Sequence, residues 1–134
     1  MINDLNQTYN KHFDYDYERG MVGENYLKEY VHGTHEVKTE YLTIKTGNFY
    51  IETFQYNING EWPSGINVTT ATHWVFASTT GNGGISIKTS LLRHILANEN
   101  LRDATQPTHN EHTNASKGKL LPLTTLLRYL SYQS

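Results

Sequence analysis

The 134-residue chain contains no cysteine, which excludes a disulfide scaffold, a thiolate zinc site and a cysteine nucleophile. It also lacks any apolar run of the length that a membrane-spanning helix requires. Its first residues have neither the basic segment nor the apolar segment of a secretory signal. We therefore expect a cytoplasmic protein with no membrane partner.

Positive charge is in short supply as well. Eleven Lys and Arg stand against 13 Asp and Glu, a formal net charge of −2, which excludes a uniformly basic nucleic-acid-binding surface. A local basic groove is still compatible with this charge, because net charge does not report how charge is distributed. The hydrophobic fraction is only 37%, but 10 Tyr, 2 Trp and 4 Phe add apolar bulk. The length predicts a single domain over residues 1–134.

The segment His-Glu-Val-Lys-Thr-Glu at residues 35–40 has the alternation of a β-strand, which places Glu36, Lys38 and Glu40 on one face. Two carboxylates and an ammonium together are the groups that a Mg²⁺-dependent phosphodiester hydrolase needs. The alternative is a solvent-facing strand with an ion pair, since such triplets are common. Within the triplet, Glu36 and Lys38 are the candidate site residues, and Glu40 is expected to be a solvated bystander.

Residues 49–56 are rich in aromatic and β-branched side chains, and we expect them to form the antiparallel partner of the strand at residues 35–44. In this second strand Glu52 shares a face with Tyr50, Phe54 and Tyr56. A carboxylate among three rings requires either a raised pKa or a cation nearby. This setting argues that Glu52 has a functional role.

The remaining pattern predicts an α+β fold with one main sheet. It contains a polar N-terminal arm, a helix with Glu24 in its first turn, two further strands, a helix capped by Thr89 or Ser90, a polar loop and a short helix after Thr124. The expected ranges are 1–19 for the arm, 20–32 for the first helix, 73–77 and 85–88 for the strands, and 103–119 for the loop.

Three weaker features favour structural interpretations. The glycine-rich segment 78–84 lacks the Gly-Lys-Ser/Thr that a phosphate-binding P-loop requires. His109 and His112 form an H-x-x-H without helical periodicity or a third ligand, so a polar loop is the preferred interpretation. Asp14 and Asp16 are expected to lie in a solvated terminal segment.

Several pieces, taken in order, resemble small, often phage-encoded proteins similar to the PD-(D/E)XK nuclease superfamily, which includes Holliday-junction resolvases and restriction endonucleases. The resemblance covers roughly residues 20–130 and implies a core of order α-β-β-β-α-β with a mixed central sheet. The residues that carry it are Glu24, Glu36-Val37-Lys38, Thr46 to Glu52, Pro63 to Ile66, Trp74-Val75-Phe76, Ile87 to Arg93, and Asn114 to Leu123.

The resemblance implies cleavage of DNA phosphodiester bonds with Mg²⁺, or Mn²⁺ as its substitute. Glu36 and Glu52 would hold the metal, Lys38 would be the site lysine, and Glu24 would be an accessory acid that also contributes to the metal site. The sequence departs from the pattern at two points. Thr34-His35 stands where Pro-Asp is expected, and no lysine follows Glu52 by two residues, so Lys38 would have to act from the neighbouring strand.

DNA is the expected partner, recognised by structure rather than by sequence, and a homodimer is among the expected assemblies. One alternative is a catalytically degenerate nuclease fold that serves as a nucleic-acid-binding or assembly module. Another is a small-molecule-binding domain that uses the aromatic strand face. The candidate phosphate contacts are Lys45, Lys88, Arg93, Lys117 and Lys119.

Overall fold

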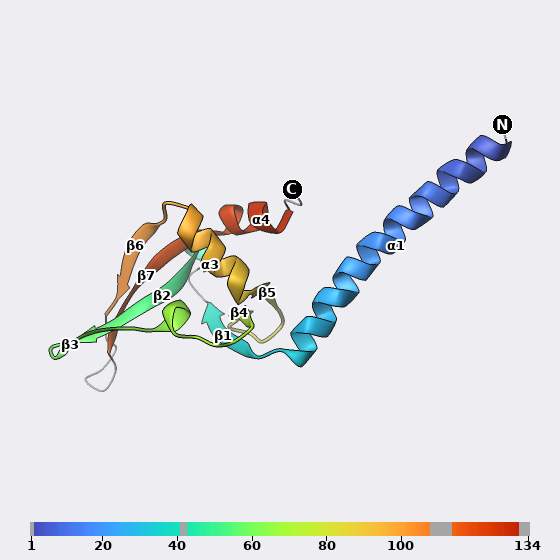
Figure 1. The fold of residues 1–134 in the computed structure, drawn as a ribbon. Coiled ribbons are helices and arrows are strands. Elements are labelled where there is room, and N and C mark those ends of the chain that lie inside the picture. Colours follow the sequence, from blue (N-terminus) through green and yellow to red (C-terminus); the bar gives the residue numbers. More distant parts are fainter. Residues whose placement is uncertain (1, 41–42, 108–113, 132–134) are drawn as a thin grey trace. The chain divides into compact units, whose positions relative to one another are not determined.

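The computed structural model describes residues 2–40, 43–107 and 114–131, with side chains described for 17–39, 45–107 and 114–131 (Figure 1). The chain divides into two compact units, residues 1–33 and residues 34–134. Each unit is described by itself.

The first unit consists of helix α1, Ile2–His32, which is 31 residues long. The helix was expected to begin at Gly20, after a polar arm, and this start was wrong. No proline interrupts residues 2–32, and a helix tolerates the glycines at 20 and 23 at a cost of about 1 kcal/mol each. Along the described part of the helix the rings of Tyr26 and Tyr30 stack, with their centroids 6.4 Å apart.

A three-stranded mixed sheet opens the second unit, with strand order β1-β4-β5. Its strands are β1 (His35–Glu40), β4 (His73–Ser78) and β5 (Gly84–Lys88). Strand β1 runs parallel to β4, whereas β5 runs antiparallel to β4. The parallel register sets Glu36 opposite Trp74 and Lys38 opposite Phe76, so these four side chains share one face of the sheet.

A four-stranded antiparallel sheet follows the order β3-β2-β7-β6. The register of β2 against β7 shifts between Glu52 and Phe54, which is a β-bulge that sets one extra residue into β2. The strands are β2 (Asn48–Asn57), β3 (Gly60–Pro63), β6 (Arg102–Gln106) and β7 (Ala115–Pro122).

The α+β class is confirmed, but the expected pairing of residues 35–44 with residues 49–56 was wrong, and so was the single main sheet. A short helix α2, Thr43–Thr46, stands between β1 and β2. Both edges of β2 are occupied, by β3 and by β7. Strand β1 therefore pairs elsewhere, with β4.

The polar loop expected over residues 103–119 was wrong at both ends, because β6 and β7 occupy much of that range. Its histidine pair, His109 and His112, lies outside the described residues. The buried positions of β7 include the small residues Ala115, Ser116 and Gly118. A strand whose buried side chains are this small lacks the apolar alternation by which strands are recognised in a sequence.

Three further elements complete the second unit: the 3₁₀ turn η1 (Gly65–Asn67) and the helices α3 (Thr89–Asn98) and α4 (Leu123–Ser131). Lys88, not Thr89 or Ser90, is the N-cap of α3, and it makes no side-chain capping bond. Thr89 is instead buried, as the first residue of the helix.

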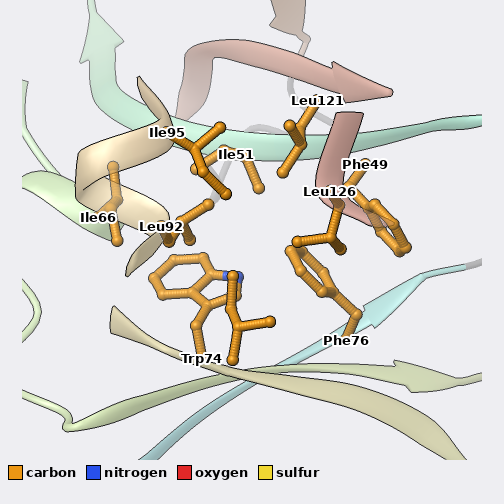
Figure 2. Packing of buried hydrophobic residues seen from close by; sticks show 10 residues of the cluster. Phe49, Ile51, Ile66, Trp74, Phe76, Leu92, Ile95, Leu121 and Leu126 are labelled. Atoms are coloured by element: carbon orange, nitrogen blue, oxygen red, sulfur yellow. The ribbon is translucent and has the colours of Figure 1, made fainter. Parts of the chain in front are cut away.

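The hydrophobic core gathers side chains from both sheets, from η1 and from helices α3 and α4 (Figure 2). Phe49 of β2 and Phe76 of β4 stack with their ring centroids 4.1 Å apart, which joins the two sheets directly. The fully buried large side chains are Trp74, Ile51, Ile66, Ile87, Leu92, Ile95, Leu121 and Leu126.

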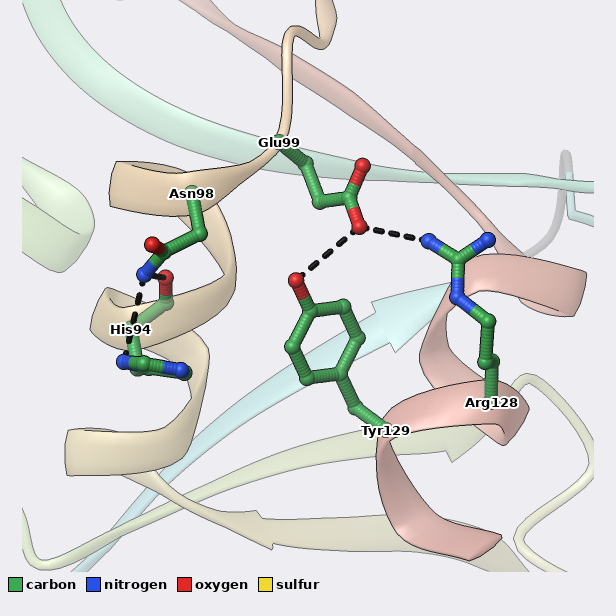
Figure 3. A network of polar contacts seen from close by, with 5 residues as sticks. All are labelled: His94, Asn98, Glu99, Arg128 and Tyr129. Carbon is green, nitrogen blue, oxygen red and sulfur yellow. Dashed lines mark hydrogen bonds and ion pairs between the residues drawn. The ribbon is translucent and has the colours of Figure 1, made fainter. Parts of the chain in front are cut away.

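The end of α3 is tied to α4 by a polar network (Figure 3). One carboxylate oxygen of Glu99 accepts hydrogen bonds from the Arg128 guanidinium and from the Tyr129 hydroxyl, the latter at 2.9 Å. The hydrogen bond to Glu99 is the main cause that raises the pKa of Tyr129. Among the helices in the described part of the chain, none is both long enough and apolar enough to cross a membrane.

Candidate functional site

A cavity of about 400 Å³, here called the inter-sheet cavity, is lined by residues of both sheets. It contains two of the residues that the sequence analysis selected, Lys38 from β1 and Glu52 from β2. The complete lining is Lys38, Thr39, Thr46, Asn48, Tyr50, Glu52, Trp74, Arg102, Ala104, Thr105, Gln106 and Leu120.

The Lys38 ammonium group lies between an acid and a ring. Its Nζ is 2.9 Å from Oε1 of Glu36 and 5.4 Å from the ring centroid of Trp74. Both side chains of the ion pair keep about a third of their surface exposed, 34% for Lys38 and 38% for Glu36, whereas Trp74 is fully buried. The parallel pairing of β1 with β4 produces this arrangement, because it places Glu36 and Lys38 on the face that carries Trp74.

Glu52 lines the cavity beside Tyr50, as their alternation along β2 predicted. The register shift pairs Glu52 with Gly118 but Phe54 with Lys117, so Phe54 and Tyr56 lie on the other face of the sheet and their predicted placement beside Glu52 was wrong. The Tyr50 hydroxyl lies 2.7 Å from Oγ of Ser116 in β7, which anchors the ring. Burial raises the pKa of Tyr50, and the nearby charge of Glu52 adds to the rise. Glu52 itself receives a long contact of 3.5 Å from the Gln55 amide.

The β-bulge of β2 holds the backbone around Glu52 against the segment that follows β3. The carbonyl of Thr53 accepts hydrogen bonds from the backbone N–H of Ser64 and from Nδ2 of Asn67, both at 2.9 Å. Gly65 then lies directly on the Glu52 backbone. Bulges are frequent beside functional sites, where they redirect a side chain.

Gly118 of β7 makes room for the Tyr50 ring. A Cβ on this glycine would come 2.8 Å from two ring atoms of Tyr50 and 2.4 Å from the carbonyl oxygen of Ile51. The ring therefore lies across the β7 backbone, and the rest of its surface lines the cavity.

The other predicted acid, Glu24, lies exposed on α1 in the first unit. Within the described residues, no three His, Asp or Glu side chains form a group that could hold a metal ion. The described acidic side chains therefore do not supply three protein ligands for a metal ion at one place. Of the two acids predicted to hold Mg²⁺, Glu52 lines the inter-sheet cavity, whereas Glu36 lies beside Lys38 and is not among the residues of the lining.

The predicted phosphate contacts fall into different settings. The Arg93 guanidinium donates to backbone carbonyls of the segment after β3, through Nη2 to Ile66 at 3.0 Å and to Thr69 at 2.7 Å. It therefore fastens α3 to that segment. Lys45 and Lys88 are exposed.

The two lysines of β7 are both ion-paired. Nζ of Lys117 lies 2.7 Å from Oε2 of Glu61 in β3, and Lys119 pairs with Asp103 of β6. The hydrogen bond to Glu61 raises the pKa of Lys117. These lysines tie neighbouring strands together in the structure.

Sequence analysis missed several residues of the cavity, among them Arg102, Asn48 and Trp74. Arg102 stands beside a segment expected to be a loop, so no strand periodicity pointed to it. Trp74 was recognised only as part of an apolar strand. Residues 102–106 read Arg-Asp-Ala-Thr-Gln, of which only Ala104 is partly buried, so the sequence carried no pattern that could have found Arg102.

Comparisons with protein-family models, with curated proteins and with solved structures find no match. The fold and the cavity define an α+β protein whose candidate site combines one lysine, one arginine and one glutamate on the cavity wall, with a second glutamate adjacent.

Proposed function

We propose that the protein is a Mg²⁺-dependent endonuclease that hydrolyses DNA phosphodiester bonds at the inter-sheet cavity. One observation carries the proposal: Lys38 and Glu52, selected from the sequence as site residues, come from different sheets and line the same cavity. Glu36, the second predicted acid, is 2.9 Å from the Lys38 ammonium. Lys38 and Glu52 support the proposal by lining one cavity, and Glu36 supports it through its ion pair with Lys38.

The resemblance to the PD-(D/E)XK superfamily contributes the reaction and the finer fold. A restriction-endonuclease-like core requires a mixed central sheet, and the β1-β4-β5 sheet, with one parallel and one antiparallel pair, supports this part of the proposal. Glu52 belongs to the other, antiparallel sheet. In the proposal Glu24 remains the accessory acid, on the resemblance alone.

The residues divide the chemistry among them. Glu52 and Glu36 supply oxygen ligands for the cation, and Arg102 and Lys38 supply positive charge for the phosphate. When bound, Mg²⁺ supplies Lewis-acid chemistry, because it neutralises charge on the phosphate and lowers the pKa of a coordinated water. Glu36 and Glu52 are the residues that would hold the cation, and Lys38, which lies beside Glu36, would contribute positive charge toward the phosphate.

Further predicted features belong to the same proposal. DNA would be gripped through its phosphates with little sequence preference, and affinity would fall as salt rises. The proposal also includes a cytoplasmic location and assembly as a homodimer. The proposed backbone contacts are Lys45, Lys88, Arg93, Lys117 and Lys119.

The test is cleavage of single-stranded, branched and duplex DNA with Mg²⁺ and with EDTA. We expect Glu52→Gln to reduce the cleavage rate by about 10²-fold or more, because it removes a charged ligand while keeping the side-chain shape. Glu99→Gln is the matched control, since Glu99 lies at the end of α3 and does not line the cavity. Equal product from the wild type and from Glu52→Gln would refute the catalytic proposal.

A second candidate function is nucleic-acid binding or assembly without catalysis. The observation that favours it is that the Lys38 ammonium is ion-paired with Glu36, so the proposed catalytic lysine is committed to a carboxylate. Thermal shift with Mn²⁺ separates the two candidates. A preformed acidic site is stabilised by the ion, and Glu52→Gln removes that stabilisation, whereas a protein without a metal site gives no shift that depends on Glu52.

A further inference from the structure

The size and lining of the inter-sheet cavity limit what can enter it. Its volume of about 400 Å³ lies within the range of roughly 300–1,000 Å³ that pockets for small ligands occupy. A duplex is instead usually recognised over an open surface, with roughly 1,000–2,500 Å² of protein buried. A cavity of this size accommodates one nucleotide unit, not a stacked base pair between two strands.

The chemistry of the wall suits the phosphate and the base of a nucleotide. Arg102 and Lys38 carry positive charge for a phosphate, and the amide of Gln106 presents a donor and an acceptor for a base edge. The Tyr50 ring is held across Gly118 and by its bond to Ser116.

Arg102 is the cation best placed to meet the phosphate. Its side chain is exposed on β6, and among the described residues it makes no side-chain hydrogen bond or ion pair. Lys38, by contrast, is committed to Glu36 in the free protein. An unpaired guanidinium at the wall of a cavity is a phosphate-binding group in its preferred form.

We infer that the inter-sheet cavity takes a single unpaired nucleotide, so that the protein selects single-stranded or locally unpaired DNA over intact duplex. This inference deepens the proposed function and rests on it for the reaction, but not for the binding. Unpaired nucleotides are favoured because their bases are already free of the stack, whereas a paired base must first be extruded at an energetic cost. The ring of Tyr50 then offers a stacking surface that is indifferent to sequence.

The experiment measures binding by the full chain, in EDTA so that cleavage does not compete, at one fixed salt concentration. The probes are a fluorescent single-stranded oligonucleotide and the duplex of the same sequence. We expect the single strand to bind about tenfold or more tightly than the duplex, and Arg102→Ala to weaken single-strand binding by about tenfold. Arg128→Ala removes the same charge away from the cavity and should leave the preference unchanged.

Competition identifies the part of the ligand that is recognised. Thymidine 5′-monophosphate should displace the single strand at lower concentration than inorganic phosphate does, and Tyr50→Leu, checked for folding by circular dichroism, should abolish that difference. Equal competition by the two would show an anion site only and overturn the inference. Duplex binding as tight as single-strand binding, no binding of either, or no effect of Arg102→Ala would also overturn it.

The outcome separates this inference from the proposed function. Single-strand binding that depends on Arg102, without cleavage in Mg²⁺, supports the ligand class and refutes the nuclease. Cleavage that prefers intact duplex and depends on Glu52 supports the nuclease and refutes the ligand class.

Discussion

Gly65 lies so close to the backbone of Glu52 that a Cβ on the glycine would come 2.2 Å from the Glu52 carbonyl oxygen. Gly65 also has a positive φ of 54°, a conformation that side chains with a Cβ disfavour. The segment after β3 therefore reaches the strand that carries Glu52 through a position that only glycine fits. The geometry of the candidate acid depends on this contact.

Gly65→Ala should destabilise the protein by more than about 2 kcal/mol, because it combines an unfavourable φ with a clash against backbone. Urea denaturation measures the change. The control is Gly81→Ala, which has a similar φ of 73° but no atom within 4 Å of the added Cβ, and which should cost only about 1 kcal/mol. Equal losses of unfolding free energy in the two variants would show that the close approach of Gly65 to Glu52 does not add to the cost of the substitution.

Tyr50 should make the stability of the protein sensitive to alkaline pH. Its pKa in the folded state is raised, chiefly by burial, so the folded state binds the hydroxyl proton more tightly than the unfolded state. This contribution is fully present below the ordinary tyrosine pKa of about 10 and is lost as pH rises through the folded-state value.

The variant Tyr50→Phe tests this linkage. At pH 8 it should be less stable than the wild type by about 1 kcal/mol, because the bond to Ser116 is lost. The difference in unfolding free energy between the wild type and Tyr50→Phe should shrink as pH rises from about 9 to about 11. Urea denaturation at each pH measures this difference. A stability difference between Tyr50→Phe and the wild type that stays constant over this pH range would contradict the linkage.

Arg93 should contribute to stability through geometry as well as charge. Its guanidinium donates to the carbonyls of Ile66 and Thr69, an arrangement that a lysine ammonium does not reproduce. Arg93→Lys should therefore lower the unfolding free energy by about 1–2 kcal/mol. Lys45→Met, which removes an exposed cation of α2, should stay within about 0.5 kcal/mol of the wild type. If Arg93→Lys had the same unfolding free energy as the wild type, these hydrogen bonds would not be maintained in solution.

Local periodicity was enough to predict much of the second unit. The spacing of Leu92 and Ile95 predicted α3, and the apolar run around Trp74 predicted β4, since burial on one helical face or in a short strand leaves a direct pattern in the sequence. The same alternation placed Tyr50 and Glu52 on one face of β2, and both line the cavity.

Strand pairing could not be predicted in the same way. The partner of β1 is β4, residues 73–78, which lies far along the sequence. Nothing in the sequence around Glu36 and Lys38 indicates that β1 pairs with β4 rather than with β2. Periodicity did not show strand β7, because its buried positions include Gly118, which lies against the Tyr50 ring, and the polar Ser116, which bonds the Tyr50 hydroxyl. Arg102 was missed with it, since β6 exists by pairing with β7.

The ion pair between Glu36 and Lys38 is the feature on which the two interpretations of β1, a catalytic site and a solvent-facing ion pair, make different predictions. Both side chains are about one-third exposed, so a double-mutant cycle with Glu36→Gln and Lys38→Met should give a stability coupling below about 1 kcal/mol. If the pair belongs to a catalytic site, each single variant should nevertheless reduce Mg²⁺-dependent DNA cleavage by about 10²-fold. Arg128→Met breaks another exposed pair, with Glu99, and should leave cleavage unchanged. Cleavage by Lys38→Met at the wild-type rate would mean that Lys38 serves only the ion pair.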